Sequence, residues 1–507
     1  MLLQDDFEGW VERDADRPAL VCGPHRYTYS DVRALAQAVA AALREGGIVR
    51  GDRVALFLDN GVELVAGVLA SLTLGAVFMP INPSTKEDKL GYMLRDARAS
   101  ALLTHDSLRS VWAPAVTSSV SVQSVLVAGQ AEGGSGSQPA ILPWPRDGVA
   151  AAAPDTIDQD LAAIIYTSGS TGLPKGVMLS HLNMVSAARS VSTYLGLGGT
   201  DVIMCALPLS FDYGLYQVLM AFRVGACVVL ERNFSFPVEV LNSMVRQQVT
   251  VFPGVPTMFS MLMAYGNLAA YDLASLRMIT NTAAALSETH IRRLRELFPQ
   301  AQLFSMYGLT ECKRVTYLPP EQLDIRPTSV GRGMPNEEVW LVDDEGRRLP
   351  NGATGELVIR GSNVMRGYWE KPEETAARLK PGPIPGEMVL YSGDLFRTDS
   401  DGWLYFVARR DDIIKSRGEK VSPREVENAI SSLEGVYEVA VIGIPDDVLG
   451  QAIKAFVTLT PGAQLTEREV IRHCLAHLES FMAPKYVEFV ESLPKTGTGK
   501  IKKTGLA

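Results

Sequence analysis

Residues 166–177 read Y-T-S-G-S-T-G-L-P-K-G-V, and this stretch decides how the rest of the chain is interpreted. It follows an apolar run, Leu161–Ile165, that is typical of a buried strand, and it leads into residues 178–185, where the sequence predicts the start of a helix. Because hydroxyl side chains, glycines and a lysine lie close together, backbone N–H groups and hydroxyls can converge on an anion. The pattern predicts a polyphosphate cradle made by Thr167, Ser168, Gly169, Ser170, Thr171, Gly172 and Lys175.

The stretch is not a Walker A loop, because none of its glycines is followed by four residues and then Gly-Lys-Ser or Gly-Lys-Thr. A flexible Ser/Gly linker is the structural alternative, but such linkers rarely contain Pro-Lys-Gly directly behind a strand. We therefore interpret the stretch as a phosphate-binding loop.

Length and composition exclude several classes of protein. With 507 residues the chain is too long for a single core, and 47% hydrophobic with 21% charged residues is an ordinary globular composition. The net charge of -9 argues against a nucleic-acid partner, since phosphate backbones require clustered Lys and Arg. Five scattered cysteines without a Cys-x-x-Cys pair argue against disulfides or a zinc site and favour a reducing, cytoplasmic location.

Two hydrophobic features bear on targeting. Residues 1–16 contain acidic residues and lack the basic start of a signal peptide. The apolar run Leu64–Ile81 is interrupted by small residues and by Pro80, so we expect a buried helix and then a core strand at 76–81. No membrane span is predicted.

Helix and strand patterns alternate from Thr28 to Leu103 and again over residues 161–303, which indicates mostly parallel sheets in an α/β arrangement. The first helix is expected over 28–45, with Ser30 or Asp31 as its N-cap. Residues 130–149 are rich in Gly, Ser and Pro, which predicts a surface loop.

The pattern changes twice towards the C-terminus. From Val330 short strands separated by turns predict a small β-rich subdomain. After Arg410, capping boxes at Ser422 and Thr466 and two strand-like runs between them predict a compact α+β domain. We expect a large N-terminal domain over residues 1–408 and a small C-terminal domain over residues 409–507.

Two later motifs carry side chains suited to a nucleotide. Residues 305–311 read S-M-Y-G-L-T-E, in which Tyr307 offers an aromatic face, Thr310 a hydroxyl and Glu311 a carboxylate for Mg²⁺. Asp394, in Ser-Gly-Asp, suits ribose hydroxyls because an ionised carboxylate only accepts hydrogen bonds. A turn aspartate and an ordinary loop after a strand are the structural alternatives.

The terminal motif is L-P-K-T-G-T-G-K at residues 493–500. Its two glycines allow the loop to reach into a cleft, and Lys500 can neutralise charge in a pentavalent transition state at phosphorus. A frayed basic tail is the structural alternative.

Together these motifs resemble those of the adenylate-forming superfamily, which includes acyl-CoA synthetases, peptide-synthetase adenylation domains and beetle luciferases. The resemblance extends from about Thr28 to Lys503. It implies that the small domain is a mobile lid that rotates about Asp411. It also implies that Thr167, Glu311 and Lys500 act in catalysis, that Tyr307, Gly308, Thr310, Asp394 and Arg409 bind the nucleotide, and that Gly418 lies at the thiol channel.

The resemblance further implies an acid pocket drawn from residues 207–217 and 281–286, with Phe211, Asp212, Gly214, Ala283, Ala284 and Ala285 as lining. Peptide-synthetase adenylation domains carry an aspartate at the position of Asp212, where it pairs with a substrate ammonium. Ala283 stands where the family usually has glycine, so its methyl group is expected to crowd the adenine or the acyl-phosphate junction.

The sequence therefore predicts an ATP-dependent acid–thiol ligase that uses Mg²⁺ and joins a small carboxylic acid to coenzyme A through an acyl-adenylate. The alternatives are an enzyme that loads an amino acid, for example a proline-like one, onto a separate carrier protein, and a ligase limited to the thioester-forming half-reaction. A luciferase-like oxygenase and a protein that only binds the adenylate are further alternatives.

Overall fold

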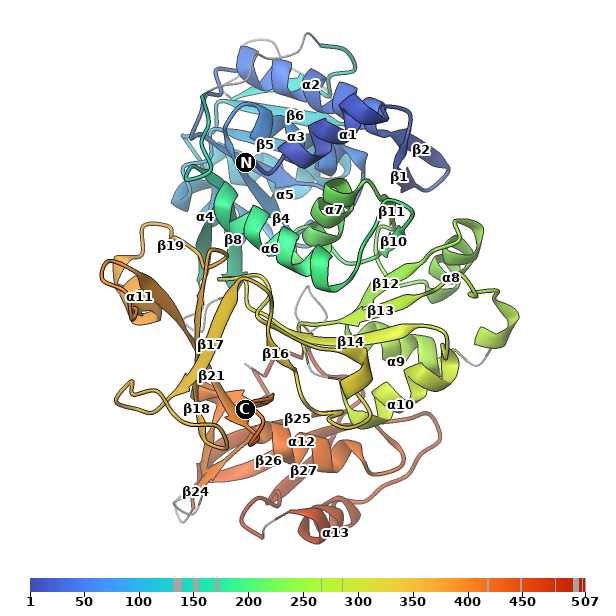
Figure 1. The fold of residues 1–507 in the computed structure, drawn as a ribbon, viewed down its shortest axis with the longest axis vertical. Helices are drawn as coiled ribbons and strands as arrows, with labels where there is room; N and C mark the ends of the chain where they lie inside the picture. The colour runs from blue at the N-terminus through green and yellow to red at the C-terminus, as the bar shows by residue number, and fades with distance from the viewer. Residues whose placement is uncertain are drawn as a thin grey trace.

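The two large sheets that hold the predicted site dominate the structure (Figure 1). The protein is described by a computed structural model that covers residues 1–130, 139–148, 155–168, 173–265, 267–284, 286–416, 419–446, 449–478, 480–495, 501–503 and 505–506. Within these ranges the strands form four sheets, and the elements keep the alternating order that the sequence predicts.

The eight-stranded sheet has the order β19-β9-β8-β4-β3-β5-β6-β7 and is parallel from β8 to β7. Strands β8 and β9 form an antiparallel hairpin, and β19 pairs with β9 at the edge. The strands are β3 (Arg53–Phe57), β4 (Val77–Ile81), β5 (Ala101–His105), β6 (Ser124–Ala128), β7 (Ala140–Pro143), β8 (Leu161–Ser168), β9 (Pro174–Ser180) and β19 (Gly367–Tyr368).

The nine-stranded sheet has the order β16-β15-β14-β13-β12-β10-β11-β1-β2 and is parallel from β14 to β1. In such sheets ligands bind outside the carboxyl ends of the strands, where β13 and β14 end here. The strands are β1 (Pro18–Cys22), β2 (His25–Thr28), β10 (Val202–Cys205), β11 (Cys227–Leu230), β12 (Val251–Gly254), β13 (Met278–Asn281), β14 (Gln302–Tyr307), β15 (Thr316–Leu318) and β16 (Arg332–Gly333).

The main core lies between these two sheets and includes helix α3 (Val62–Thr73). Residues Val62 and Leu64–Leu72 of α3 are all buried, which explains an apolar run without amphipathic periodicity. The predicted buried helix and core strand at residues 64–81 are therefore confirmed as α3 and β4. The other helices of this part are α1 (Asp5–Arg13), α2 (Tyr29–Glu45), α4 (Glu87–Asp96), α5 (Arg109–Thr117), α6 (His181–Tyr194), α7 (Asp212–Val224), α8 (Pro237–Arg246), α9 (Pro256–Ala264), α10 (Glu288–Leu297) and α11 (Pro372–Arg378).

The β-rich subdomain is an antiparallel five-stranded sheet, as its turn-punctuated sequence predicts. Strand β22 ends at Arg409, which pairs in register with Asp394 of β21. The strands are β17 (Glu337–Val342), β18 (Thr354–Gly361), β20 (Leu379–Pro381), β21 (Met388–Thr398) and β22 (Leu404–Arg409).

The last sheet lies at one end of the molecule, at the bottom of Figure 1, and has a core of its own. The two predicted capping residues, Ser422 and Thr466, cap its helices α12 (Pro423–Ser431) and α13 (Glu467–His477). Its strands are β23 (Ile414–Ser416), β24 (Glu419–Val421), β25 (Val436–Asp446), β26 (Gly450–Leu459) and β27 (Tyr486–Phe489). The α/β and α+β fold class is confirmed, whereas the division into residues 1–408 and 409–507 stays a prediction.

Three local predictions are wrong. Residues 174–180 form strand β9, because β8 and β19 pair with them on both sides, and the helix begins only at His181. The N-cap of α2 is Thr28, which forms a reciprocal capping box with Asp31. Part of the predicted 130–149 loop is strand β7, which extends the eight-stranded sheet.

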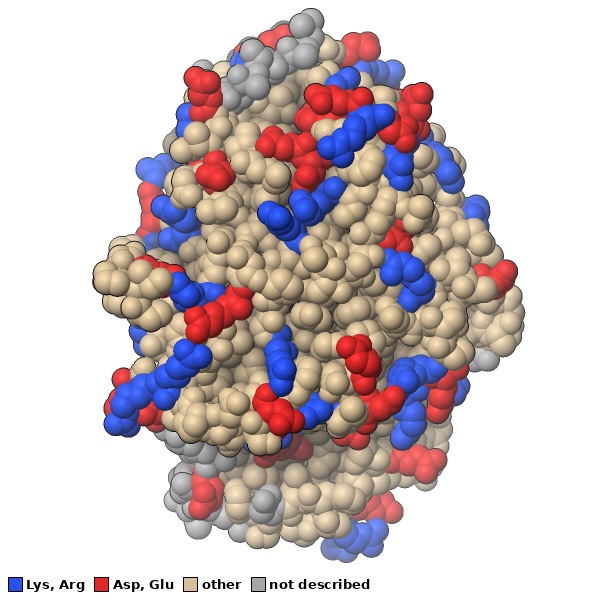
Figure 2. Space-filling model, in the orientation of Figure 1, with Lys and Arg blue, Asp and Glu red and all other residues tan. Residues whose placement is uncertain are grey.

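The surface carries charges of both signs. On the face drawn in Figure 2, basic and acidic side chains of the described residues lie interspersed among other residues. No helix in the described part of the chain is long and apolar enough to cross a membrane.

The turn from β9 into α6 depends on a buried capping box. The Ser180 hydroxyl accepts from the Asn183 N–H, the Asn183 side chain accepts from the Ser180 N–H, and Ser180 is 1% exposed. We expect Ser180→Ala to lower the free energy of unfolding by about 1–2 kcal/mol, measured by urea denaturation. Thr193→Ala, which removes an exposed hydroxyl at the other end of α6, should change it by less than about 0.5 kcal/mol.

Candidate active site

The β8–β9 hairpin positions the flanks of the predicted phosphate cradle. Thr167 lies opposite Lys175, and the backbone of Ser168 pairs with that of Pro174. The predicted residues Gly169, Ser170, Thr171 and Gly172 lie outside the described residues. The described flanks of the predicted cradle therefore lie in a hairpin whose strand β9 also pairs with β19.

A tyrosine links the hairpin to the predicted metal ligand. The Tyr368 hydroxyl donates a 2.7 Å hydrogen bond to Oε1 of Glu311, and the Lys175 ammonium lies 5.5 Å from the centre of the Tyr368 ring. Burial and the neighbouring Glu311 carboxylate raise the pKa of Tyr368 above its usual value, so the hydroxyl stays a donor. Lys175 and Glu311, which were predicted from separate motifs, therefore both interact with the side chain of Tyr368.

Tyr368 was not predicted from the sequence. A Gly-Tyr pair within M-R-G-Y-W carries no ionised group and no recognisable spacing, so it gave no chemical signal. Its place is decided by the pairing of β19 with β9, which aligns Tyr368 with Val177 in the hairpin.

A second pair joins the predicted purine and ribose residues. The Tyr307 hydroxyl donates a 2.6 Å hydrogen bond to Oδ2 of Asp394, and Nε of Arg409 lies 3.9 Å from Oδ1. Asp394 is 5% exposed, and burial raises the pKa of its carboxyl, while the Tyr307 hydroxyl and the Arg409 guanidinium oppose that shift. The Tyr307 ring packs edge-on against Phe396 at 4.8 Å, which fixes its orientation.

The loop between Tyr307 and β15 is held by hydrogen bonds from another segment. Asn363, 1% exposed, donates from Nδ2 to the carbonyls of Cys312 and Arg314 at 2.7 and 3.2 Å. The Met365 N–H donates to the Glu311 carbonyl at 2.7 Å. A Cβ at Gly308 would clash with the Lys313 backbone, so the predicted nucleotide-binding glycine is required by this tight fold. Thr310, beside Glu311, is half-buried in the same loop.

The first predicted acid-pocket segment forms the start of α7. Asp212 is 8% exposed at the first turn of the helix, and the half-buried Phe211 ring packs edge-on against Tyr213 at 6.4 Å. A Cβ at Gly214 would clash with the backbone carbonyls of Leu207 and Pro208. Position 214 therefore requires glycine because the backbone of Leu207 and Pro208 fills the space that a side chain would occupy.

The second predicted acid-pocket segment contains backbone strain. Ala283 has φ +75°, a left-handed conformation that L residues with a Cβ rarely adopt. Ala284 is exposed, and its carbonyl accepts a 2.9 Å hydrogen bond from Nδ2 of Asn281 at the end of β13. The predicted Ala285 lies outside the described residues.

Few of the predicted C-terminal site residues are described. Gly418 and Lys500 lie outside the described residues, and only the backbone of Asp411 is described, in the 3₁₀ turn Arg410–Asp412. The residues on either side of the terminal loop, Lys495 and Ile501, are joined by an antiparallel bridge.

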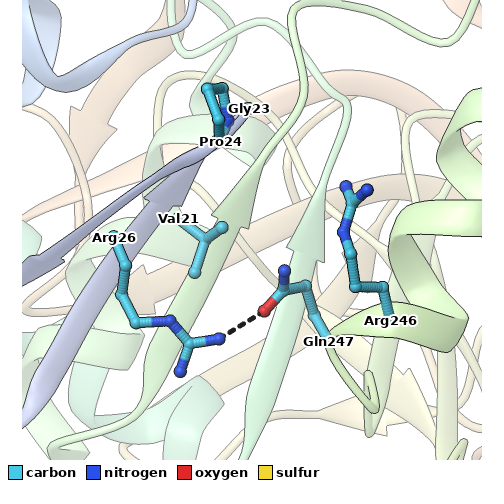
Figure 3. Close-up of a pocket in the computed structure, with 6 residues that line it drawn as sticks. All are labelled: Val21, Gly23, Pro24, Arg26, Arg246 and Gln247. Carbon is cyan, nitrogen blue, oxygen red and sulfur yellow. Dashed lines mark hydrogen bonds between the residues drawn. The ribbon is translucent and has the colours of Figure 1, made fainter.

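A surface cavity of about 550 Å³ lies apart from these residues, between the β1–β2 turn and the end of α8. Figure 3 shows Arg26 and Arg246 lining it, with an Arg26–Gln247 hydrogen bond of 2.6 Å. Its lining contains no carboxylate, hydroxyl or lysine, so the cavity is not part of the candidate active site.

The side chains fit a magnesium nucleotide. Among the described residues no three His, Cys, Asp or Glu side chains cluster to hold a metal, and Glu311 is the carboxylate predicted to bind Mg²⁺. Mg²⁺ is commonly held by one or two carboxylates together with nucleotide phosphates, which matches this arrangement. The buried Asp394 carboxylate, with Oδ1 beside Arg409, suits a ribose hydroxyl.

Comparison with known proteins agrees with this fold. Residues 7–369 match the AMP-binding enzyme family and residues 425–500 match the AMP-binding enzyme C-terminal domain. The chain is 30% identical to a long-chain-fatty-acid–CoA ligase of Bacillus subtilis (strain 168), over 98% of this chain and 93% of that protein. It is 28% identical to tyrocidine synthase 3 of Brevibacillus parabrevis, over 99% of this chain and 8% of that protein.

Among solved structures, the anthranilate CoA ligase AuaEII in complex with anthranoyl-AMP is similar with a TM-score of 0.90 at 28% identity. The match covers 100% of this chain and 96% of that chain. Fold and motifs together define an adenylate-forming enzyme. The chain belongs to the AMP-binding enzyme family.

The strain at Ala283 predicts an order of stability. We expect Ala283→Gly to match or exceed the native free energy of unfolding by up to about 1 kcal/mol, and Ala283→Val to lower it by about 1–2 kcal/mol. Urea denaturation checks the order. Pyrophosphate exchange by Ala283→Gly should stay within about threefold of the native rate, whereas an increase above about tenfold would support the half-reaction alternative.

Proposed function

We propose that the protein is an ATP-dependent acid–thiol ligase that forms an acyl-adenylate and then an acyl-CoA thioester. The observation that carries this proposal is the convergence of Lys175, Glu311 and Tyr368 beside the pair formed by Tyr307 and Asp394. Tyr307 and Glu311 are four residues apart, so the proposed adenine and metal contacts lie close together along the chain.

In the proposed first step, the carboxylate of the acid attacks the α-phosphorus of ATP and displaces pyrophosphate. Asp394 and Arg409 hold the ribose, and the Tyr307 ring lies against the adenine. Thr167, Ser168, Gly169, Ser170, Thr171, Gly172 and Lys175 surround the phosphates, with Thr310 beside them. Mg²⁺ bound at Glu311 would neutralise phosphate charge, and Lys500 stabilises the developing negative charge at phosphorus.

In the proposed second step, a free thiol attacks the acyl carbon and AMP leaves. The small domain rotates about Asp411 between the steps, so that Lys500 withdraws and the thiol channel at Gly418 reaches the site. Coenzyme A is the proposed thiol, and a separate carrier protein is the alternative.

Amino-acid activation is the second candidate function. It is supported by the buried Asp212 at the start of α7, because a buried carboxylate requires a cation or hydrogen-bond donors. The similarity to tyrocidine synthase 3 also favours it. In that case the acceptor is a separate carrier protein.

Lys500 provides a test of the two-step reaction. We expect Lys500→Ala to reduce ATP–pyrophosphate exchange by about 100-fold or more, because the charge that stabilises the transition state is lost. Thioester formation from synthetic acyl-AMP should stay within about threefold of the native rate. Lys502→Ala, an exposed neighbour, is the matched control. Equal loss of both half-reactions would contradict the role given to Lys500.

Tyr368 provides an independent test. Tyr368→Phe removes the hydrogen bond to Glu311, so we expect kcat/KM for MgATP to fall about 10- to 100-fold, the usual range for a hydrogen bond to a charged group. Tyr405→Phe, which removes a tyrosine hydroxyl bonded to Asp399, should leave kcat/KM within about twofold. Steady-state kinetics at varied MgATP measure both, and a loss of equal size in the two variants counts against the assignment.

A further inference from the structure

Two adjacent cations lie inside the protein, in the loop that carries the predicted magnesium ligand Glu311. Lys313 is 3% exposed and Arg314 is 5% exposed. The ammonium of Lys313 and Nε of Arg314 have no hydrogen-bond partner among the described residues, and neither side chain forms an ion pair within that part of the chain. Because buried charges are unfavourable unless they are paired, this arrangement calls for an anionic partner.

The backbone forces both side chains inward. Lys313 has φ +70°, an unfavourable conformation for a lysine, and its N–H bonds the Leu309 carbonyl at 2.6 Å. Asn363 holds the carbonyls of the residues on either side, Cys312 and Arg314. Backbone strain that surrounding hydrogen bonds maintain is typical of functional loops. The fold therefore holds the side chains of Lys313 and Arg314 in the interior.

Arg314 reaches the predicted acid pocket. The carbon of its guanidinium lies 4.9 Å from the centre of the Tyr213 ring, and Tyr213 follows Asp212 in α7. The Tyr213 hydroxyl is fixed by a 2.8 Å hydrogen bond to the Thr280 carbonyl. The guanidinium therefore lies on a rigid aromatic face within the segment that should contact the acid.

The two cations differ in the carboxylates around them. The Asp212 and Glu311 carboxylates lie near the Lys313 ammonium. Arg314, by contrast, forms no ion pair with a carboxylate of the described residues.

We propose that the pocket selects a dicarboxylic acid, whose second carboxylate binds the guanidinium of Arg314 while its first carboxylate is activated. This inference rests on the proposed acid activation at the same site. A second carboxylate on the substrate supplies the anionic partner that the buried Arg314 guanidinium lacks among the described residues. The geometry favours an anionic over a cationic substituent.

The test compares acids within two series, each of which shares one carbon skeleton. Butanoate, butanedioate, 4-aminobutanoate and 2-aminobutanoate share four carbons, and benzoate, benzene-1,2-dicarboxylate and 2-aminobenzoate share a ring. Acid-dependent pyrophosphate release is measured for the native protein, for Arg314→Met and Arg314→Lys, and for the control Arg246→Met, an exposed arginine in Figure 3. Thermal melting of each variant establishes that it is folded.

We expect the native protein and the Arg246→Met control to favour a dicarboxylate over its monocarboxylate by at least about 30-fold in kcat/KM. Arg314→Met should abolish most of that preference, mainly through KM, while monocarboxylate turnover stays within about threefold. Arg314→Lys should keep part of the preference, and it decides the question if Arg314→Met does not fold.

Two results overturn the inference. One is a native preference for a monocarboxylate or an amino acid. The other is an equal loss for all acids in both Arg314 variants, which would give Arg314 a purely structural role. If no acid in an extended panel of fatty, aryl and amino acids releases pyrophosphate, the proposed function itself fails, together with the inference that rests on it.

Discussion

The hydrogen bonds from Asn363 to the carbonyls of Cys312 and Arg314 hold the loop on which the candidate active site depends. This loop begins at Tyr307 and carries Glu311, so a single constraint orients the proposed purine and metal contacts. Because Asn363 is almost completely buried, its two donor bonds are shielded from competition with water. The same bonds direct the two following cations inward.

Buried charge is a recurring property of this site. Asp394 is enclosed, yet it receives a tyrosine hydroxyl and faces an arginine, so the carboxylate has donors before any ligand arrives. Glu311 is likewise met by the Tyr368 hydroxyl. Preorganised donors of this kind strengthen electrostatic interactions with a nucleotide, because little reorganisation is needed when it binds.

The proposed rotation of the small domain would break some of the contacts that this domain now makes. The Ser422 hydroxyl, at the N-terminus of α12, donates a 2.6 Å hydrogen bond to the Val407 carbonyl of β22. Lys503 forms a 2.7 Å ion pair with Glu427 of α12, which ties the segment after the terminal loop to the small domain. The described segment that follows the predicted Lys500 loop is thus attached to α12 of the small domain.

Sequence alone determined the class of protein, because a phosphate-binding loop, a nucleotide motif and a terminal lysine loop are local patterns of residue type. It also determined the buried helix and strand at residues 64–81, because a predominantly apolar segment indicates burial. Tertiary structure decided that residues 174–180 are a strand, because both of its pairing partners come from elsewhere in the chain.

Only the tertiary structure placed the Tyr307 hydroxyl on Asp394, 87 residues away, and Arg314 on Tyr213. It likewise showed that Ala283 occupies a left-handed conformation, which explains why glycine suits that position. Local patterns report the periodicity and chemistry of neighbouring residues. Contacts between distant segments depend on strand pairing and loop closure, which residue types along one stretch do not encode.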